Sequence, residues 1–125
     1  MLDKIFLAKK LLAWNQEYLT KDSPLRKEDI ATCFAKEFTV RANGREYFAN
    51  HDSYFDFLNS FRATIDSITY EVHEYLETPE SIILPMTATI VRINGEKEMF
   101  EAMLWLQFND EGLVTLWHEV YLKIL

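Results

Sequence analysis

The chain of 125 residues is poor in cysteine, glycine and proline, with one, three and three of them. The single cysteine, Cys33, excludes an internal disulfide, so the fold must be stable without one, as is usual in a reducing compartment. We expect Cys33 to be buried as a small apolar residue. The few glycines form no phosphate-binding loop, and no low-complexity segment or internal repeat is present.

Long uncharged apolar runs are also absent. Lys9 and Lys10 interrupt the apolar stretch that begins at Ile5, which argues against a signal peptide and a membrane span, so we expect a cytoplasmic protein. The net charge of -7 makes nucleic acid and anionic membranes unsuitable partners. The three histidines lack metal-ligand spacing, and we expect neither a metal nor a cofactor.

Apolar residues, in contrast, are plentiful. The chain is 49% hydrophobic and 14% aromatic, which excludes intrinsic disorder. Its length suits a single domain over residues 1–125, able to bury roughly two-thirds of its unfolded surface. The aromatic share favours a large core, an aromatic-lined pocket or an adhesive sheet face.

Helical periodicity dominates the first part of the chain. Leu7, Leu11 and Trp14 recur with a helical spacing that predicts an amphipathic helix over about residues 3–19. A second helix is predicted after Pro24, and a third near residue 51 with Asp52 as its cap. We expect the inward faces of these two helices to carry Ile30, Cys33, Phe34, Tyr54, Leu58, Phe61 and Ile65.

A period of two, typical of strands, begins at Phe38. The pair Asn43-Gly44 predicts a hairpin turn between strands over 38–42 and 45–48. Everything from Ser67 onward reads as strand, and Pro85 indicates an edge, a bulge or a bend. The later strands are predicted over about 67–73, 81–93, 98–108 and 113–124, giving an α+β fold in which three helices cover a curved antiparallel sheet.

The strand over 98–108 has two different faces. We expect the helices to cover its more apolar face, which carries Phe100, Leu104 and Phe108. The opposite face holds Met103 and Trp105, which are large apolar groups on what should be the outer surface. Such residues are more typical of a subunit interface than of bare surface, so we expect a homodimer through the outer sheet face.

Four segments of the sequence occur in a characteristic order. They are LLAWNQ, FTVRANGREYFANHDSYFDFL, RINGEKEMFEAMLWLQFNDEG and VTLWHEVY. With this order and spacing the chain resembles the nuclear transport factor 2-like superfamily, which includes ketosteroid isomerases, SnoaL-like polyketide cyclases, scytalone dehydratase and non-enzymatic modules. The resemblance implies a cone-shaped half-barrel of α+β class, with three N-terminal helices on a curved, mostly antiparallel sheet, a pocket at its mouth and often a dimer through the sheet. It does not fix a function.

The chain departs from the ketosteroid isomerases at their functional positions. By the resemblance, Arg41 and Ala42 stand where the catalytic carboxylate should be, Leu104 where the second acid should be, and Asn15 near the helix tyrosine. A proton-shuttling isomerase needs a base at one end of its substrate and a donor at the other. We therefore expect no steroid isomerase activity.

Glu119 is the strongest candidate for chemistry. Counted from Gly112, the resemblance places Trp117, Glu119 and Tyr121 inward with Thr115, so that Glu119 would be desolvated and able to act as an acid or base. The alternation itself favours the opposite interpretation, in which Glu119 faces solvent or pairs with a lysine. The more apolar face of this strand carries Val114, Leu116, Val120 and Leu122. The conflict is resolved if that face is the dimer interface.

Other residues are candidates for the same pocket. His73 lies on a different strand and either meets the pocket as a second catalytic group or is a partly buried histidine held by a hydrogen bond. Asn15 either orients a ligand or bonds to the backbone. The remaining expected ligand-binding residues are Trp14, Tyr54, Leu104, Trp117 and Tyr121.

Two functions remain open at this point. The first is a small-molecule-binding SnoaL-like domain, with or without acid-base activity of the cyclase, isomerase or dehydratase kind on a small hydrophobic ligand. The second is a non-catalytic dimerisation or protein-binding module that uses the sheet face. The aromatic content and Glu119 favour the first, and the missing carboxylates favour the second.

Overall fold

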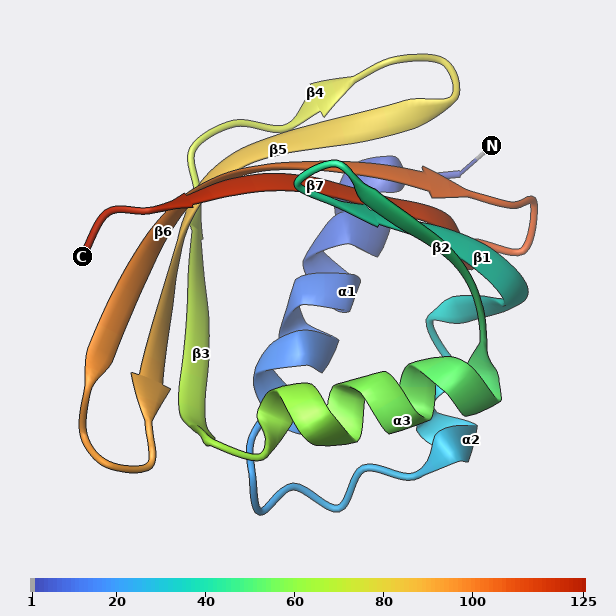
Figure 1. Cartoon of the computed structure of the whole chain (residues 1–125). Helices are drawn as coiled ribbons and strands as arrows, with labels where there is room; N and C mark the ends of the chain where they lie inside the picture. The colour runs from blue at the N-terminus through green and yellow to red at the C-terminus, as the bar shows by residue number, and fades with distance from the viewer. Residues whose placement is uncertain (1) are drawn as a thin grey trace.

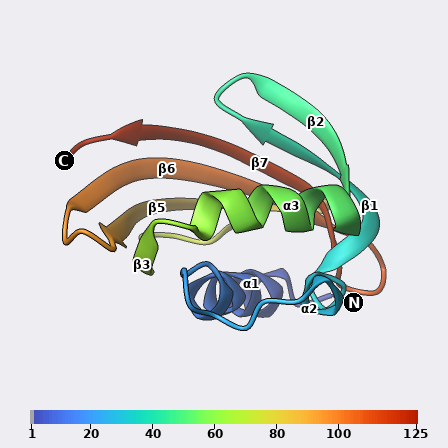
Figure 2. The same cartoon turned by 60° about the horizontal axis from the view of Figure 1, so that its bottom comes forward.

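The computed structural model describes residues 2–125 and contains three helices beside one large sheet (Figure 1). The helices are α1 (Lys4–Tyr18), α2 (Lys27–Ile30) and α3 (His51–Arg62). Figure 2 shows all three on the same side of the sheet. This α+β arrangement, a mostly antiparallel open sheet with helices on one face, confirms the predicted fold class.

The start of each long helix is fixed by a side-chain cap. The Asp3 carboxylate accepts a hydrogen bond from the Phe6 amide at 3.0 Å and begins α1. Helix α3 is capped by Asn50, which exchanges hydrogen bonds with Ser53, and not by Asp52 as predicted. Asp52 is exposed and pairs with Lys27 at 2.6 Å, because its place inside the first turn points it outward.

The second helix is much shorter than the sequence predicts. Helix α2 has four residues, so Cys33 and Phe34 lie beyond it. Phe34 is the first residue of β1, and the amide of Val114 donates to the Cys33 carbonyl at 2.8 Å. Pairing with the last strand therefore prevails over the helical spacing here. Both side chains are buried, as predicted.

The sheet has the order β2-β1-β7-β6-β5-β3, and β4 pairs with β5. Only β1 and β7 run parallel, while the other neighbours are antiparallel. The parallel pair was not predicted, because pairing between strands far apart in the sequence leaves no local signal. The short β4 was not predicted either, because two residues are too few to show an alternating pattern. The strands are β1 (Phe34–Ala42), β2 (Arg45–Asn50), β3 (Ile65–Val72), β4 (Leu76–Glu77), β5 (Ser81–Arg92), β6 (Lys97–Phe108) and β7 (Val114–Lys123).

Pro85 lies in the middle of β5, at a point where one side of the strand has no continuous partner strand, which agrees with the predicted edge. On one side β5 pairs with β6 without a break. On the other side β3 ends at Val72, opposite Met86, and β4 begins at Leu76, opposite Ile83. The missing N–H of Pro85 faces this gap, while its carbonyl accepts from the His73 amide at 2.8 Å.

A bulge in β7 explains the conflicting patterns of that strand. Val114 is paired with Phe108 and Leu116 with Gln107, so β7 takes two residues for one step of β6. Val114 is fully buried, whereas beyond the bulge the side chains opposite buried β6 residues are Trp117 and Glu119. Simple alternation across the whole strand therefore assigns the wrong face. None of the helices in residues 2–125 is long and apolar enough to cross a membrane.

Candidate functional site

Glu119 lies on the sheet face that the helices cover. Its neighbours in register are Ala42 on β1 and the buried Leu104 on β6. Two residues away in each direction, Trp117 is paired with Leu106 and Tyr121 with Ala102, both of which are buried. The structure thus brings Leu104, Trp117, Glu119 and Tyr121 to one concave face.

The surroundings of Glu119 change its acidity. Burial raises the pKa of its carboxyl from 4.5 to about 7, and the side chain of Trp117 acts in the opposite direction with a smaller effect. No charged group contributes to this pKa. The residue as a whole keeps some solvent exposure, and a carboxyl with this pKa is close to half-protonated at neutral pH.

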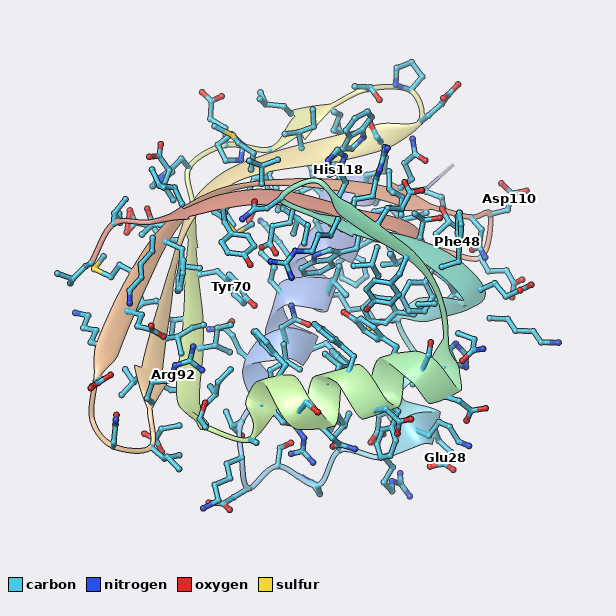
Figure 3. All side chains as sticks on the ribbon, viewed as in Figure 1. Glu28, Phe48, Tyr70, Arg92, Asp110 and His118 are labelled. Carbon is cyan, nitrogen blue, oxygen red and sulfur yellow. The ribbon has the colours of Figure 1, made fainter. Side chains whose placement is uncertain are left out.

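Three more polar side chains gather near Glu119 from the helices and from β3. Asn15 of α1 is only 3% exposed, and its amide donates to the Tyr70 hydroxyl at 3.2 Å. Figure 3 shows Tyr70 extending from β3 into the space between the sheet and α1. Burial raises the pKa of Tyr70, and the charge of Glu119 raises it further. The pKa of Tyr54 on α3 is also raised, mainly by burial and then by Tyr47 and Glu119. We call Asn15, Tyr54, Tyr70 and Glu119, with Leu104 and Trp117, the concave site.

Aromatic rings surround the concave site. Tyr121 meets Phe100 edge to face with ring centroids 5.8 Å apart. On α3 the rings of Tyr54, Phe57 and Phe61 follow one another in two stacked contacts of 5.8 and 6.0 Å. Phe57 and Phe61 are partly exposed, although the sequence predicts Phe61 to be inward. These rings offer an apolar, planar surface to a ligand.

The concave site can bind a ligand and protonate it. Within residues 2–125 no group of three His, Cys, Asp or Glu side chains could hold a metal ion. The concave site therefore offers one titrating carboxyl, two tyrosine hydroxyls and one amide. These groups can donate hydrogen bonds to a ligand oxygen, and Glu119 can move a proton.

Two predicted site residues lie elsewhere. Trp14 is a core residue whose indole N–H donates to the Asp29 carbonyl at 3.2 Å, which ties α1 to the end of α2. His73 is exposed and contacts the Thr87 hydroxyl at 3.1 Å. Since Thr87 is paired with the exposed Glu101, this contact is on the face opposite Glu119, and the structure does not bring His73 to the concave site.

The opposite face of the sheet carries an apolar surface of its own. Met103, Val120 and Leu122 are 49%, 54% and 66% exposed, and Trp105 stacks on His118 with centroids 5.6 Å apart. Figure 3 shows His118 on the side of the sheet away from the helices. We call Met103, Trp105, Val120 and Leu122 the outer patch.

A surface hollow borders the outer patch and not Glu119. It has a volume of about 690 Å³ and is open to solvent. Its lining comes from the β1–β2 turn, from the middle of β6 and from the last part of β7, with Asn43, Gly44, Glu101, Ala102, Met103, Val120, Tyr121 and Leu122.

Sequence reasoning missed Tyr70 and Tyr47. Tyr70 lies in a predicted strand, and a buried Asn15 in need of a partner indicates that some polar group must reach it, without indicating which one. Tyr47 faces the same side as Val40 and Trp117, and its buried hydroxyl has no hydrogen-bond partner within residues 2–125. Burial raises the pKa of Tyr47 to about 12.

Comparison with known proteins supports one family. Residues 13–117 match the SnoaL-like domain family. A comparison with curated proteins finds no significant match.

Solved structures with the same fold are numerous and distant in sequence. An NTF2-like protein of unknown function from Burkholderia pseudomallei is 13% identical, with 95% of this chain and 90% of that chain covered and a TM-score of 0.73. An LEH-like epoxide hydrolase from M. tuberculosis is 12% identical over 94% and 81% of the two chains, with a TM-score of 0.74. A putative isomerase from Rhodopseudomonas palustris is 10% identical over 97% and 90%, with a TM-score of 0.72. At these identities the similarity shows the fold alone.

Proposed function

Because this chain belongs to the SnoaL-like domain family of the nuclear transport factor 2-like superfamily, we propose that it binds a small hydrophobic molecule at the concave site. The observation that carries this proposal is Glu119, a partly buried carboxyl with a pKa near 7 on a face bordered by aromatic rings. A carboxyl kept in this state costs folding stability, and such groups gather at functional sites.

We further propose that the chemistry is proton transfer. The carboxylate form of Glu119 takes a proton from a carbon or oxygen of the ligand, and the acid form returns it to another atom, so that the enzyme ends unchanged. A pKa near the working pH suits both steps. Two of the similar structures bear enzyme names, an epoxide hydrolase and a putative isomerase, which supports an enzyme of the cyclase, isomerase or dehydratase kind.

Mapping the binding site by NMR tests the first proposal. Titration with 2-acetylnaphthalene, an uncharged aromatic ketone, is expected to shift the backbone amides of Tyr70, Trp117 and Glu119. The amides of Met103 and Trp105 serve as the internal control for the other face of the sheet. Shifts confined to the outer patch, or none at millimolar ligand, would contradict binding at the concave site.

The outer patch favours a second role that is compatible with the first. Exposed apolar residues on a central part of a sheet are typical of interfaces, and we propose that the patch joins two copies of the chain. Light scattering at micromolar concentration is expected to give twice the chain mass of 14.8 kDa. Met103→Glu should give a monomer with unchanged folding, and a monomeric wild-type protein would refute the proposal.

A further inference from the structure

Arg45 lies on the same side of the sheet as Glu119. It is paired with Ala42 of β1, which in turn is paired with Glu119 of β7, and residues paired in register present their side chains on one face. Tyr47, two residues further along β2, shares this face and contacts Phe57 of α3 with ring centroids 6.1 Å apart. The side chain of Arg45 therefore belongs to the face that the helices cover, close to the β1–β2 turn.

The guanidinium of Arg45 is a free cation on this face. It is exposed and forms no ion pair within residues 2–125, whereas Arg41, on the outer face beside the same turn, pairs with Glu46 at 2.6 Å. Among those residues, Glu119 is the only acid on the helix-covered face of β1, β2 and β7. No charged group contributes to the pKa of Glu119, so Arg45 does not compensate that carboxyl.

A small residue separates Arg45 from Glu119. Neighbouring strands lie about 4.8 Å apart, so two such steps place the two backbones about 10 Å from each other. The residue between them is Ala42, whose side chain is a single methyl group and which is only partly buried. A carboxylate bound by Arg45 would have room above this methyl group and would bring the adjoining atoms of a ligand to Glu119.

Elsewhere the concave face adds positive charge and neutral groups. Arg92 and Lys123 both pair with Glu98, at 2.7 and 2.9 Å, so this cluster has one positive charge in excess. The other titratable side chains that face the concave site are tyrosines, which are uncharged at neutral pH. They are Tyr47, Tyr54, Tyr70 and Tyr121. An anionic ligand would therefore meet a surplus of positive charge around Glu119, and a carboxyl that is itself close to half-protonated at neutral pH.

Resting on the binding function proposed above, we propose that Arg45 binds a carboxylate group of the ligand, while the apolar remainder of the ligand lies over Glu119 and the aromatic rings. The ligand class is therefore a small apolar carboxylic acid in its ionised form. The planar fork of a guanidinium matches a carboxylate with two parallel hydrogen bonds, and one free cation compensates one negative charge. Because Arg45 is exposed, the carboxylate stays partly hydrated and avoids the full cost of burial.

Two probes of one shape test the ligand class. They are 2-naphthoate, which is an anion, and 2-acetylnaphthalene, which has the same ring system and no charge. At pH 6 the wild-type protein should bind 2-naphthoate about fivefold more tightly, the effect of one well-formed exposed ion pair. Dissociation constants come from NMR titration of the full chain, with the amides of Trp117 and Glu119 reporting the concave site.

Substitutions at the two arginines beside the turn locate the source of this preference. Arg45→Gln should bind both probes equally well, because it loses affinity for 2-naphthoate while its affinity for the ketone stays the same. Arg45→Lys keeps the charge and should retain at least a twofold preference. Arg41→Gln is the matched control, since it removes the same charge from the outer face of the neighbouring strand, and it should keep the full preference.

The charge of the ligand should also be coupled to Glu119. An anion held beside this carboxyl favours its acid form, so the wild-type affinity for 2-naphthoate should fall about threefold from pH 6 to pH 8. The ligand and Arg45 keep their charges over this range. The affinity of Glu119→Gln, which has no carboxyl to titrate, should therefore not change between the two pH values.

The outcomes distinguish this inference from the function on which it rests. If neither probe binds the wild-type protein, both are wrong. If the ketone binds at the concave site and 2-naphthoate binds no more tightly, the binding function stands and the anionic ligand class is wrong. An equal loss of preference in Arg41→Gln and Arg45→Gln would show an effect of net charge and would overturn the role of Arg45. A wild-type affinity for 2-naphthoate that does not change with pH would contradict its position beside Glu119.

Discussion

The pKa of Glu119 predicts that Glu119→Gln stabilises the protein in a pH-dependent way. The carboxyl titrates near 7 when folded and at 4.5 when unfolded, so folding binds a proton between these values. The charged form thus lowers stability as the pH rises from 4.5 through 7, and the cost is complete above 7. From the two pKa values the cost is about 1 kcal/mol at pH 5 and about 3 kcal/mol at pH 8.

Urea unfolding at pH 5 and pH 8 measures this difference. Glutamine has the same shape without a charge, so Glu119→Gln should gain about 1 kcal/mol at pH 5 and about 3 kcal/mol at pH 8 relative to wild type. Other titrating groups, such as Glu98 and Asp52, are present in both proteins and cancel in the comparison. Glu101→Gln, on the exposed face of the neighbouring strand, should change stability by less than about 0.5 kcal/mol at either pH.

The reasoning fails if Glu119→Gln gives the same change at both pH values. It also fails if the variant is less stable than wild type at pH 8, because the carboxylate would then have a favourable partner in the folded protein. A gain that increases with pH in Glu101→Gln as well would point to the net charge of -7 instead of to burial.

Three further outcomes follow from the geometry. The protein should not isomerise a ketosteroid, because Ala42 and Leu104, the two neighbours of Glu119 in register, are apolar, and turnover far above buffer would refute this. Tyr47→Phe should leave the melting temperature level or raise it, since it removes a buried hydroxyl without a partner, and a clear loss in calorimetry would reveal a missed partner. Asn43→Gly should lower the free energy of unfolding in urea by about 1–2 kcal/mol, because the Asn43 side chain accepts from the Tyr121 amide at 2.9 Å and donates to its carbonyl at 3.2 Å. Glycine still adopts the positive φ of 49° found at this position. An unchanged midpoint would show that water replaces both bonds.

The sequence was sufficient for the class of fold and for most strands. The hairpin at Asn43-Gly44, the alternation after Ser67 and the helix of about residues 3–19 depend on local chemistry, and the structure has all of them. Phe34 is the instructive failure, because its helical spacing relative to Ile30 is real and yet pairing with Val114 places it in a strand. Such long-range pairing is not encoded in local spacing.

The candidate site was only partly predictable for the same reason. Trp117, Glu119 and Tyr121 share a face beyond the bulge. The family resemblance implies this face, whereas simple alternation across the whole strand assigns the other one. For His73 two alternatives were open, a pocket residue or a histidine held by a hydrogen bond. The structure shows the hydrogen bond, because His73 lies on the face of Glu71, which is paired with Thr87. Tyr70 reaches Asn15 across 55 residues of sequence, and no spacing rule joins two such positions.

The titration of Glu119 in the wild-type protein is the most direct test of the central claim. Carboxyl NMR, with the signal assigned by its loss in Glu119→Gln, should show a midpoint near pH 7, because burial raises the pKa of this group from 4.5 to about 7. A midpoint near 4.5 would mean that the carboxyl is hydrated like an ordinary surface glutamate. The concave site would then have no group able to exchange a proton at neutral pH, and the proposed acid-base function would be wrong.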